Sequence, residues 1–208
     1  MPRVTRKQAD LNREAIKVAA ARLFREKGFT GVAIPEITGA AGLTHGSFYG
    51  HFSSKEQMAA EASAAAFRVG FERWELRRAG QPSAAAARTG FIAGYLTERN
   101  RDNPGDACPL AALAGDVARL GLESPVRKTF IDGIQVILEK LASVQAGGDA
   151  GTVERQALTD LSAMVGALIL SRATKSSALS EKFLHLVTAE LTRAAAPEAL
   201  PPEGEVDG

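Results

Sequence analysis

The spacing of apolar residues is the feature that most constrains the fold of this chain. They recur three and four positions apart along most of its length, as on one face of a helix, and runs that alternate apolar and polar residues are almost absent. The sequence therefore predicts an all-α protein of about nine helices. Capping residues, glycines and prolines divide the pattern into expected helices at 7–27, 34–41, 44–51, 53–79, 83–99, 109–121, 125–144, 152–171 and 177–195.

Basic residues are concentrated in the first quarter of the chain. Residues 1–55 hold nine Lys and Arg against four acidic residues, a net charge of +5, whereas the whole chain carries +1 and the remainder therefore −4. A basic segment joined to a slightly acidic body is typical of a nucleic-acid-binding head on a body that avoids phosphates. A solvated charged face on the first helix would explain the same excess.

Residues 28–56 predict a helix-turn-helix. Ile37 faces inward from the first of two short helices, residues 42–44 form a tight turn with a buried leucine, and Phe48 and Phe52 anchor the second helix. Two helices joined in this way present the second one to the major groove of DNA. The capping box at the start of the next helix is expected to use Ser53 and Glu56.

The polar groups of the second helix predict how it would contact double-stranded DNA. Hydroxyls, helix-start amides and a lysine ammonium suit phosphates, the first exposed side chains of the helix suit base edges, and a glycine permits close approach. A histidine at the end of this helix is expected to cap or pack rather than read a base. The predicted DNA-binding residues are Thr44, His45, Gly46, Ser47, Tyr49, His51 and Lys55.

This region also resembles the helix-turn-helix of the TetR family of regulators. The positions that match its pattern are Gly28, Phe29, Ile37, Ala41, Gly42, Leu43, Gly46, Tyr49, His51, Phe52, Ser54, Lys55 and Glu56. The sequence of this region, together with residues 108–118, is similar to that of a branch of the family that contains multidrug and aromatic-compound regulators. Val32 and Ala33 depart from the pattern, because the family usually caps the second helix with Thr or Ser. Beyond Glu56 the resemblance implies the fold and a homodimer, but no particular ligand.

Aromatic residues gather on the helices that follow. Helical spacing places Phe67, Phe71 and Trp74 on one face, and Phe91 and Tyr95 on another. Two interpretations stay open: a filled core, or an aromatic-lined pocket for a small, mostly apolar effector. The predicted pocket residues are Phe67, Phe71, Trp74, Phe91, Tyr95, Cys108 and Phe130.

Cys108 is the only cysteine in the chain, which excludes an internal disulfide and a cysteine-clustered zinc site. It precedes the helix expected at 109–121, where free amides would favour a thiolate. A buried structural cysteine is one interpretation, and a redox or electrophile sensor is another.

The last two expected helices carry a wide apolar surface, which predicts a two-fold, four-helix dimer interface. A bundle within one chain is the alternative. The predicted interface residues are Leu161, Val165, Leu168, Phe183, Leu184, Val187 and Leu191.

These features predict three parts: a helix-turn-helix DNA-binding domain at 1–55, a ligand-binding and dimerisation domain at 56–195, and a disordered tail at 196–208. No catalytic constellation, cofactor motif, metal site, signal peptide or membrane span is evident, so we expect a cytoplasmic protein that is not an enzyme. The predicted function is that of a repressor released from a palindromic operator by a small, mostly apolar or aromatic effector. The alternative is an architectural DNA-binding protein without an effector.

Overall fold

The computed structural model describes residues 5–145 and 147–193, which contain nine α-helices, two 3-10 helices and no strand. The predicted all-α class is therefore confirmed. The helices are α1 (Arg6–Lys27), α2 (Ile34–Ala40), η1 (His45–Gly50), α3 (Lys55–Ala79), α4 (Ala84–Tyr95), α5 (Glu98–Asp102), η2 (Pro104–Asp106), α6 (Pro109–Ala118), α7 (Pro125–Ala142), α8 (Ala150–Ala173) and α9 (Ala178–Thr192).

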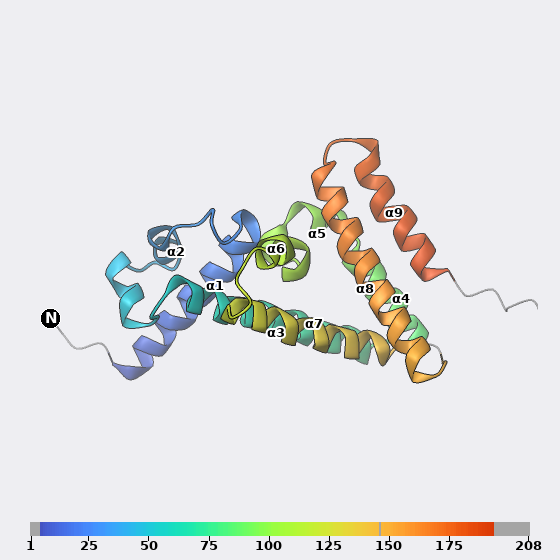
Figure 1. Cartoon of the computed structure of the whole chain (residues 1–208), viewed down its shortest axis with the longest axis horizontal. Helices are drawn as coiled ribbons and strands as arrows, with labels where there is room; N and C mark the ends of the chain where they lie inside the picture. Colours follow the sequence, from blue (N-terminus) through green and yellow to red (C-terminus); the bar gives the residue numbers. More distant parts are fainter. Residues whose placement is uncertain (1–4, 146, 194–208) are drawn as a thin grey trace, which may run out of the picture.

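The helices form a small head and a larger body (Figure 1). The head consists of α1, α2, η1 and the start of α3, and it lies at the N-terminal end of the molecule. In the body, α3 and α7 run side by side as a long pair, while α8 and α9 form a hairpin. The short helix α6 contacts α1, α3, α7 and α8, so it lies between head and body.

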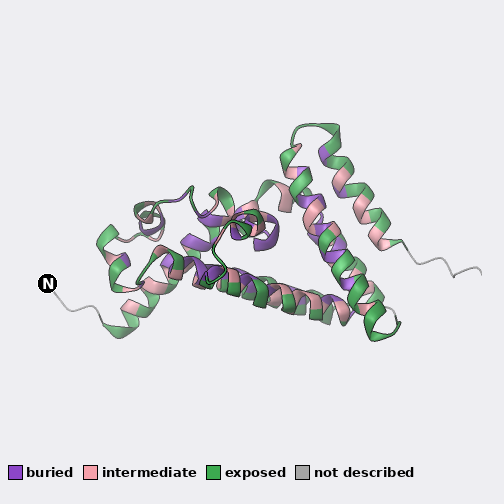
Figure 2. Ribbon diagram, viewed as in Figure 1, coloured by how far each residue is buried: buried purple, intermediate pink, exposed green. Residues whose placement is uncertain are grey.

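Buried residues, purple in Figure 2, occur in both the head and the body, and the buried hydrophobic residues of the two parts form one continuous cluster. In the head, Ile16, Phe24, Ile37 and Phe48 are each at most 1% exposed. In the body the core includes an ion pair: Arg88 of α4 donates to both carboxylate oxygens of the fully buried Asp160 of α8, at 2.7 and 2.8 Å. A buried pair of this kind fixes how two helices sit against each other, because breaking it leaves a buried charge.

The start of α3 differs from the prediction by one residue. Ser54, not Ser53, is the N-cap, and its hydroxyl accepts from the amide of Gln57 at 3.0 Å. The side chain of Gln57 reaches back to the amide of Ser53 at 2.8 Å. Glu56 is thereby free of capping and instead accepts a hydrogen bond of 2.6 Å from Ser124, before α7.

The helix expected at 83–99 is two helices. The hydroxyl of Thr97 accepts from the amide of Asn100, which starts α5 as a separate helix after α4 has ended at Tyr95. Further on, α8 begins two residues before the predicted start because Asp149, not Thr152, provides its cap. In both places the sequence contained more than one residue able to cap, and the local pattern did not rank them.

The helix expected at 44–51 is the 3-10 helix η1, and it follows a turn in which Gly42 has a φ of 71°. This left-handed conformation favours glycine. Leu43 in the same turn is half-buried. The cap of α2 is missing as expected, since Ala33 occupies the position.

Within the described ranges, no helix combines the length and apolar character needed to cross a membrane. The tail expected at 196–208 lies outside the described residues.

Candidate DNA-binding surface and ligand pocket

The segment η1 exposes one face of the head to solvent. Thr44, His45, Gly46 and Tyr49 are exposed, and the side chain of Tyr49 remains 65% accessible. The rings of His45 and Tyr49 meet edge to face, with centroids 5.6 Å apart. Phe48, between them in sequence, points inward and is 1% exposed. The buried ring of Phe48 therefore anchors η1 to the head and holds its other face toward solvent.

The other predicted DNA contacts are already engaged within the chain. The Ser47 hydroxyl is 3.0 Å from that of Thr44. The Lys55 ammonium donates to the carbonyl of Phe29 at 2.6 Å, which ties the start of α3 to the end of α1. His51 is half-buried, and its carbonyl accepts from Arg13. These residues position the exposed face, and their predicted contacts with DNA stay predictions.

Arg13 of α1 is a residue that sequence reasoning missed. Its guanidinium donates to both oxygens of Glu61 at 2.6 Å and lies 4.5 Å above the ring of Phe52. It therefore joins α1, the end of η1 and α3. The sequence places Arg13 and Glu61 48 positions apart, so no local pattern could have paired them.

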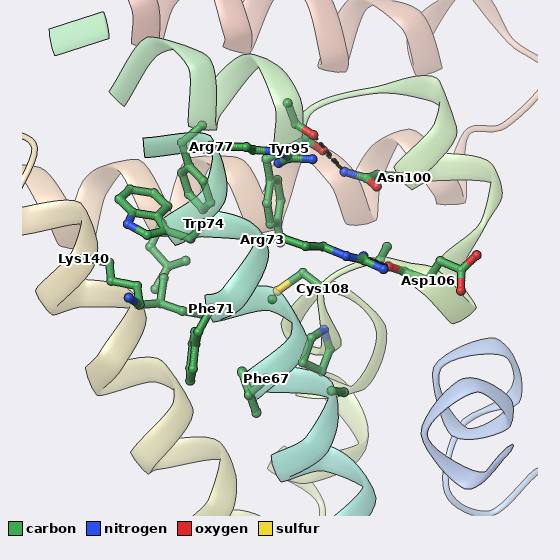
Figure 3. Close-up of a pocket in the computed structure, with 18 residues that line it drawn as sticks. Phe67, Phe71, Arg73, Trp74, Arg77, Tyr95, Asn100, Asp106, Cys108 and Lys140 are labelled. Atoms are coloured by element: carbon green, nitrogen blue, oxygen red, sulfur yellow. Dashed lines mark hydrogen bonds between the residues drawn. The ribbon is translucent and has the colours of Figure 1, made fainter. Parts of the chain in front are cut away.

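A cavity of about 110 Å³ lies at the far end of α3 (Figure 3). Six of the seven predicted pocket residues line it: Phe67, Phe71, Trp74, Phe91, Tyr95 and Cys108. Phe67, Trp74 and Tyr95 also belong to the buried core, so the same residues pack within the chain and line the cavity. The seventh, Phe130, is a correction: it is 2% exposed and packs edge-on behind Phe67, with centroids 5.2 Å apart, outside the cavity wall.

The pocket is more polar than an aromatic stripe suggests. Arg73 and Arg77 from α3 and Lys140 from α7 also line it, as do Asn100 and Asp106. In Figure 3 the side chain of Arg77 lies beside Tyr95, Arg73 extends toward Asp106, and Lys140 approaches from the side of Trp74. Arg73 and Arg77 flank Trp74 along α3, and this spacing was the only signal that could have found them.

Two polar groups in the pocket wall are buried without a hydrogen-bond partner in the described part of the chain, Trp74 Nε1 and Tyr95 Oη. Burial is the main cause that raises the pKa of Tyr95 well above its ordinary value, and the neighbouring Cys108 adds to it. The phenol is therefore neutral and able to donate.

Cys108 is half-buried in this wall. Burial raises the pKa of its thiol, although the nearby hydroxyl of Tyr95 and the backbone amides of Leu110 and Ala111 act in the opposite direction. The amides at the start of α6 thus lower the pKa of the thiol, as predicted, but the effect of burial is larger and the pKa is raised. A thiol whose pKa is raised by burial agrees better with a structural cysteine than with a reactive sensor.

The predicted dimer surface needs correction. Leu161, Leu168 and Leu184 are buried within a single chain, and Leu161 lines the pocket. Val165, Phe183, Val187 and Leu191 are half-buried. The large apolar residues that α8 and α9 expose are Leu158, Ile169, Leu170, Leu179 and Leu186. Helical periodicity identified the correct helices but assigned part of the inward face to the partner.

Residues 104–108 connect the pocket to the head. On the head side, Arg25 of α1 donates to the carbonyl of Gly105, with its Nε at 2.8 Å. On the pocket side, Arg73 donates to the carbonyl of Asp106 at 3.0 Å. In addition, the carboxylate of Asp116 in α6 accepts from the amide of Phe29 at 2.9 Å. A displacement of residues 104–108 would therefore alter the hydrogen bonds that hold the C-terminal end of α1.

Comparisons with known proteins agree with this architecture. Residues 16–62 match the family described as bacterial regulatory proteins, tetR family. Over 61 residues the chain is 38% identical to the HTH-type transcriptional regulator AcrR of Shigella flexneri, a match that covers 29% of this chain and 28% of AcrR. The chain therefore aligns with less than a third of this curated relative.

Solved structures extend the likeness to the body. A TetR-family regulator from Cytophaga hutchinsonii superposes with a TM-score of 0.74 at 22% identity, covering 89% of this chain and 94% of that one. A structure of AibR in complex with isovaleryl coenzyme A and operator DNA has a TM-score of 0.62 at 16% identity, covering 87% and 98%. At these identities the likeness shows a shared fold.

The match at residues 16–62 and the helix-turn-helix head support a DNA-binding transcriptional regulator. The head is similar to the DNA-binding domain of the tetR family, and the described body has the fold of solved TetR-family regulators. Since these are regulators, the assignment agrees with the expectation that the chain is not an enzyme.

Proposed function

We propose that this chain is a homodimeric repressor whose head, residues 1–55, binds a palindromic DNA operator and whose body, residues 56–195, dimerises and binds a small effector that releases the DNA. The observation that carries the proposal is the coincidence of the family match at 16–62 with a head that exposes η1. The net charge of +5 on residues 1–55 favours approach to phosphates.

In this proposal the exposed face of η1 enters the major groove. The hydroxyls of Thr44 and Tyr49 contact phosphates, and His45 reaches a base edge, with Gly46 permitting close approach. Lys55 contacts phosphate only if it exchanges its bond to the Phe29 carbonyl for one to DNA. Its main role is then to hold α3 against the head.

The dimer forms through the exposed apolar residues of α8 and α9. Leu158 and Ile169 lie on α8, and Leu179 and Leu186 lie seven residues apart on α9, each at least 40% exposed in the single chain. Two copies of this hairpin would form a four-helix interface. A two-fold axis there places two heads on one operator, which is why we propose a palindrome.

Effector release works through residues 104–108. A ligand in the pocket contacts Asp106 or Cys108 and shifts this segment, and Arg25 passes the shift to α1. Small rotations of the heads spoil binding, because two recognition segments must fit major grooves about 34–36 Å apart. AibR, which has this fold, is seen in complex with both isovaleryl coenzyme A and operator DNA, so a protein of this fold can bind a small molecule as well as DNA.

A binding-site selection with the full chain on random DNA tests the proposal. We expect a palindrome whose half-sites lie about one helical turn apart, on the order of 10 base pairs. Recovery of sequences without a common palindrome would contradict it and favour the architectural alternative.

A double variant tests the dimer surface. Leu179→Glu with Leu186→Glu should give a monomer that no longer binds the operator tightly. The control Leu122→Glu changes an exposed leucine outside these two helices, and it should leave the dimer and its DNA binding unchanged.

A further inference from the structure

The chemistry of the pocket wall indicates what kind of molecule it takes. The indole of Trp74 and the phenol of Tyr95 are 5% and 7% exposed, and neither polar atom has a hydrogen-bond partner within residues 5–145 and 147–193. An indole N–H can only donate, and a protonated phenol donates its hydrogen. Buried donors without acceptors are costly, so a ligand whose acceptor oxygen reached either donor would offset part of this cost.

The charges around the same cavity favour an anion. Lys140 forms an ion pair with Glu75, and Arg73 donates one N–H to the carbonyl of Asp106. Arg77 has neither an acidic partner nor a hydrogen bond among the residues described, although its guanidinium lies next to Gly94, above the α4 backbone. Its planar fork of donors matches the two oxygens of a carboxylate. Asp106 is the one acidic residue in the described lining, and it lies on the side of Arg73.

Size and wall composition limit the rest of the ligand. The cavity of about 110 Å³ is of the order of one that holds a benzene ring, about 150 Å³. Aromatic side chains from α3 and α4 form part of its wall. The rings of Trp74 and Phe91 meet edge to face, with their centroids 4.2 Å apart. One aromatic ring would therefore fill the apolar part and leave its substituent at the basic rim.

We propose that the effector is a small, single-ring aromatic carboxylate, with its ring between Phe71, Trp74 and Phe91 and its carboxylate held by Arg77, whose side chain lies beside Tyr95. This inference rests on the proposed function, since it names the ligand class of the same pocket. A cationic ligand is disfavoured because three basic side chains line the cavity. A neutral aromatic ligand fills the ring site but leaves the guanidinium of Arg77 without a partner.

The single tryptophan of the chain makes the test direct, because Trp74 is in the pocket wall and is the only source of tryptophan fluorescence. The full-length protein is titrated with benzoate and with benzamide, which have nearly the same shape but differ in charge. We expect both to change the emission of Trp74, and benzoate to bind at least about tenfold more tightly, as for a hydrogen bond to a charged group.

Two variants and one control show which side chains cause the preference for benzoate over benzamide. Arg77→Gln should lower benzoate affinity about tenfold and leave benzamide nearly unchanged, so that the two ligands become equal. The matched control is Arg78→Gln, a neighbouring cation on α3 that does not line the pocket, and it should leave both affinities unchanged. Tyr95→Phe should weaken benzoate by a smaller factor, about two- to tenfold.

Equal binding of the two ligands, no effect of Arg77→Gln on their ratio, or no binding of either at millimolar concentration would overturn the carboxylate proposal. The titration contains no DNA, so such a failure leaves the proposed repressor function standing. That function fails separately if the selection on random DNA yields no palindrome.

Discussion

The head and the pocket are both built on clusters of aromatic residues, yet one cluster is closed and the other encloses a cavity. In the head, Phe24, Phe29, Phe48 and Phe52 are at most 9% exposed. In the pocket, Phe71 and Phe91 are only half-buried, and Trp74 and Tyr95 keep polar atoms without partners in the described residues. Similar side chains thus form a closed core at one end of α3 and line a cavity at the other.

The difference comes from how the clusters are assembled. The head cluster is drawn from residues 24–52, which are close in sequence and joined by short turns, and Lys55 and Arg13 tie it to α3. The pocket is drawn from α3, α4, α5, η2, α6, α7 and α8 and from residues 107–108, which only partly fill the space between them. Short connections favour complete packing, whereas the meeting of distant helices leaves room for a binding site.

The largest expected effect comes from opening the closed cluster. Phe48→Ala should lower the free energy of unfolding by about 3–5 kcal/mol, because it removes a fully buried ring. Phe71→Ala, in the half-buried pocket wall, should cost less than about 2 kcal/mol. Denaturant unfolding of both variants measures the contrast. Equal losses would mean that the two clusters are packed alike.

The next effect concerns the exposed face that the closed cluster holds. His45→Ala should relax the preference at one base pair by about 1–3 kcal/mol, as expected for loss of a base-edge contact. Tyr49→Ala should weaken binding to all sequences by a similar factor, because a phosphate contact carries no sequence information. Binding-site selection with each variant separates the two patterns. A selection unchanged by His45→Ala would remove this residue from base reading.

The link between the two regions is the third target. Arg25→Gln should reduce the factor by which a pocket ligand weakens DNA binding, since it removes the hydrogen bonds from the head to the Gly105 carbonyl. The control is Lys17→Gln, which changes a charge on α1 without touching this segment. Operator affinity with and without ligand gives the factor for each variant. A wild-type factor in Arg25→Gln would place the coupling elsewhere, for example along α3.

The smallest effect is expected in the pocket without ligand. Tyr95→Phe removes a buried hydroxyl that has no partner among the described residues, so the free energy of unfolding should stay within about 1 kcal/mol of wild type or rise slightly. A loss of several kcal/mol in thermal or denaturant unfolding would show that the hydroxyl is satisfied in the free protein. The pocket would then lack one of its two open donors.

The sequence predicted the head more fully than the pocket. Local patterns fixed α1, α2, the turn at Gly42 and the buried positions of Phe48 and Phe52. Local patterns also identified six residues of the pocket wall. They did not single out Arg77, although its position three residues after Trp74 places it on the same side of α3. They could not reveal the pairing of Arg25 with Gly105 across 80 positions.

The same limit applies to the surface of α8 and α9. Leu161 and Leu168 fit an apolar stripe whether they face a partner or their own core, and only the packing of α8 against the rest of the chain decides. Periodicity finds an apolar face, but the number of helices that cover this face depends on tertiary structure.

The central claim is that the pocket controls the head, and reciprocal binding tests it most directly. The affinity of the full-length dimer for its selected operator is measured by fluorescence anisotropy, with and without a saturating ligand that changes Trp74 emission. The account predicts operator binding about 5- to 150-fold weaker with ligand, and ligand binding weaker by the same factor on operator, as linkage requires. An operator affinity that is unchanged when the pocket is filled would contradict it.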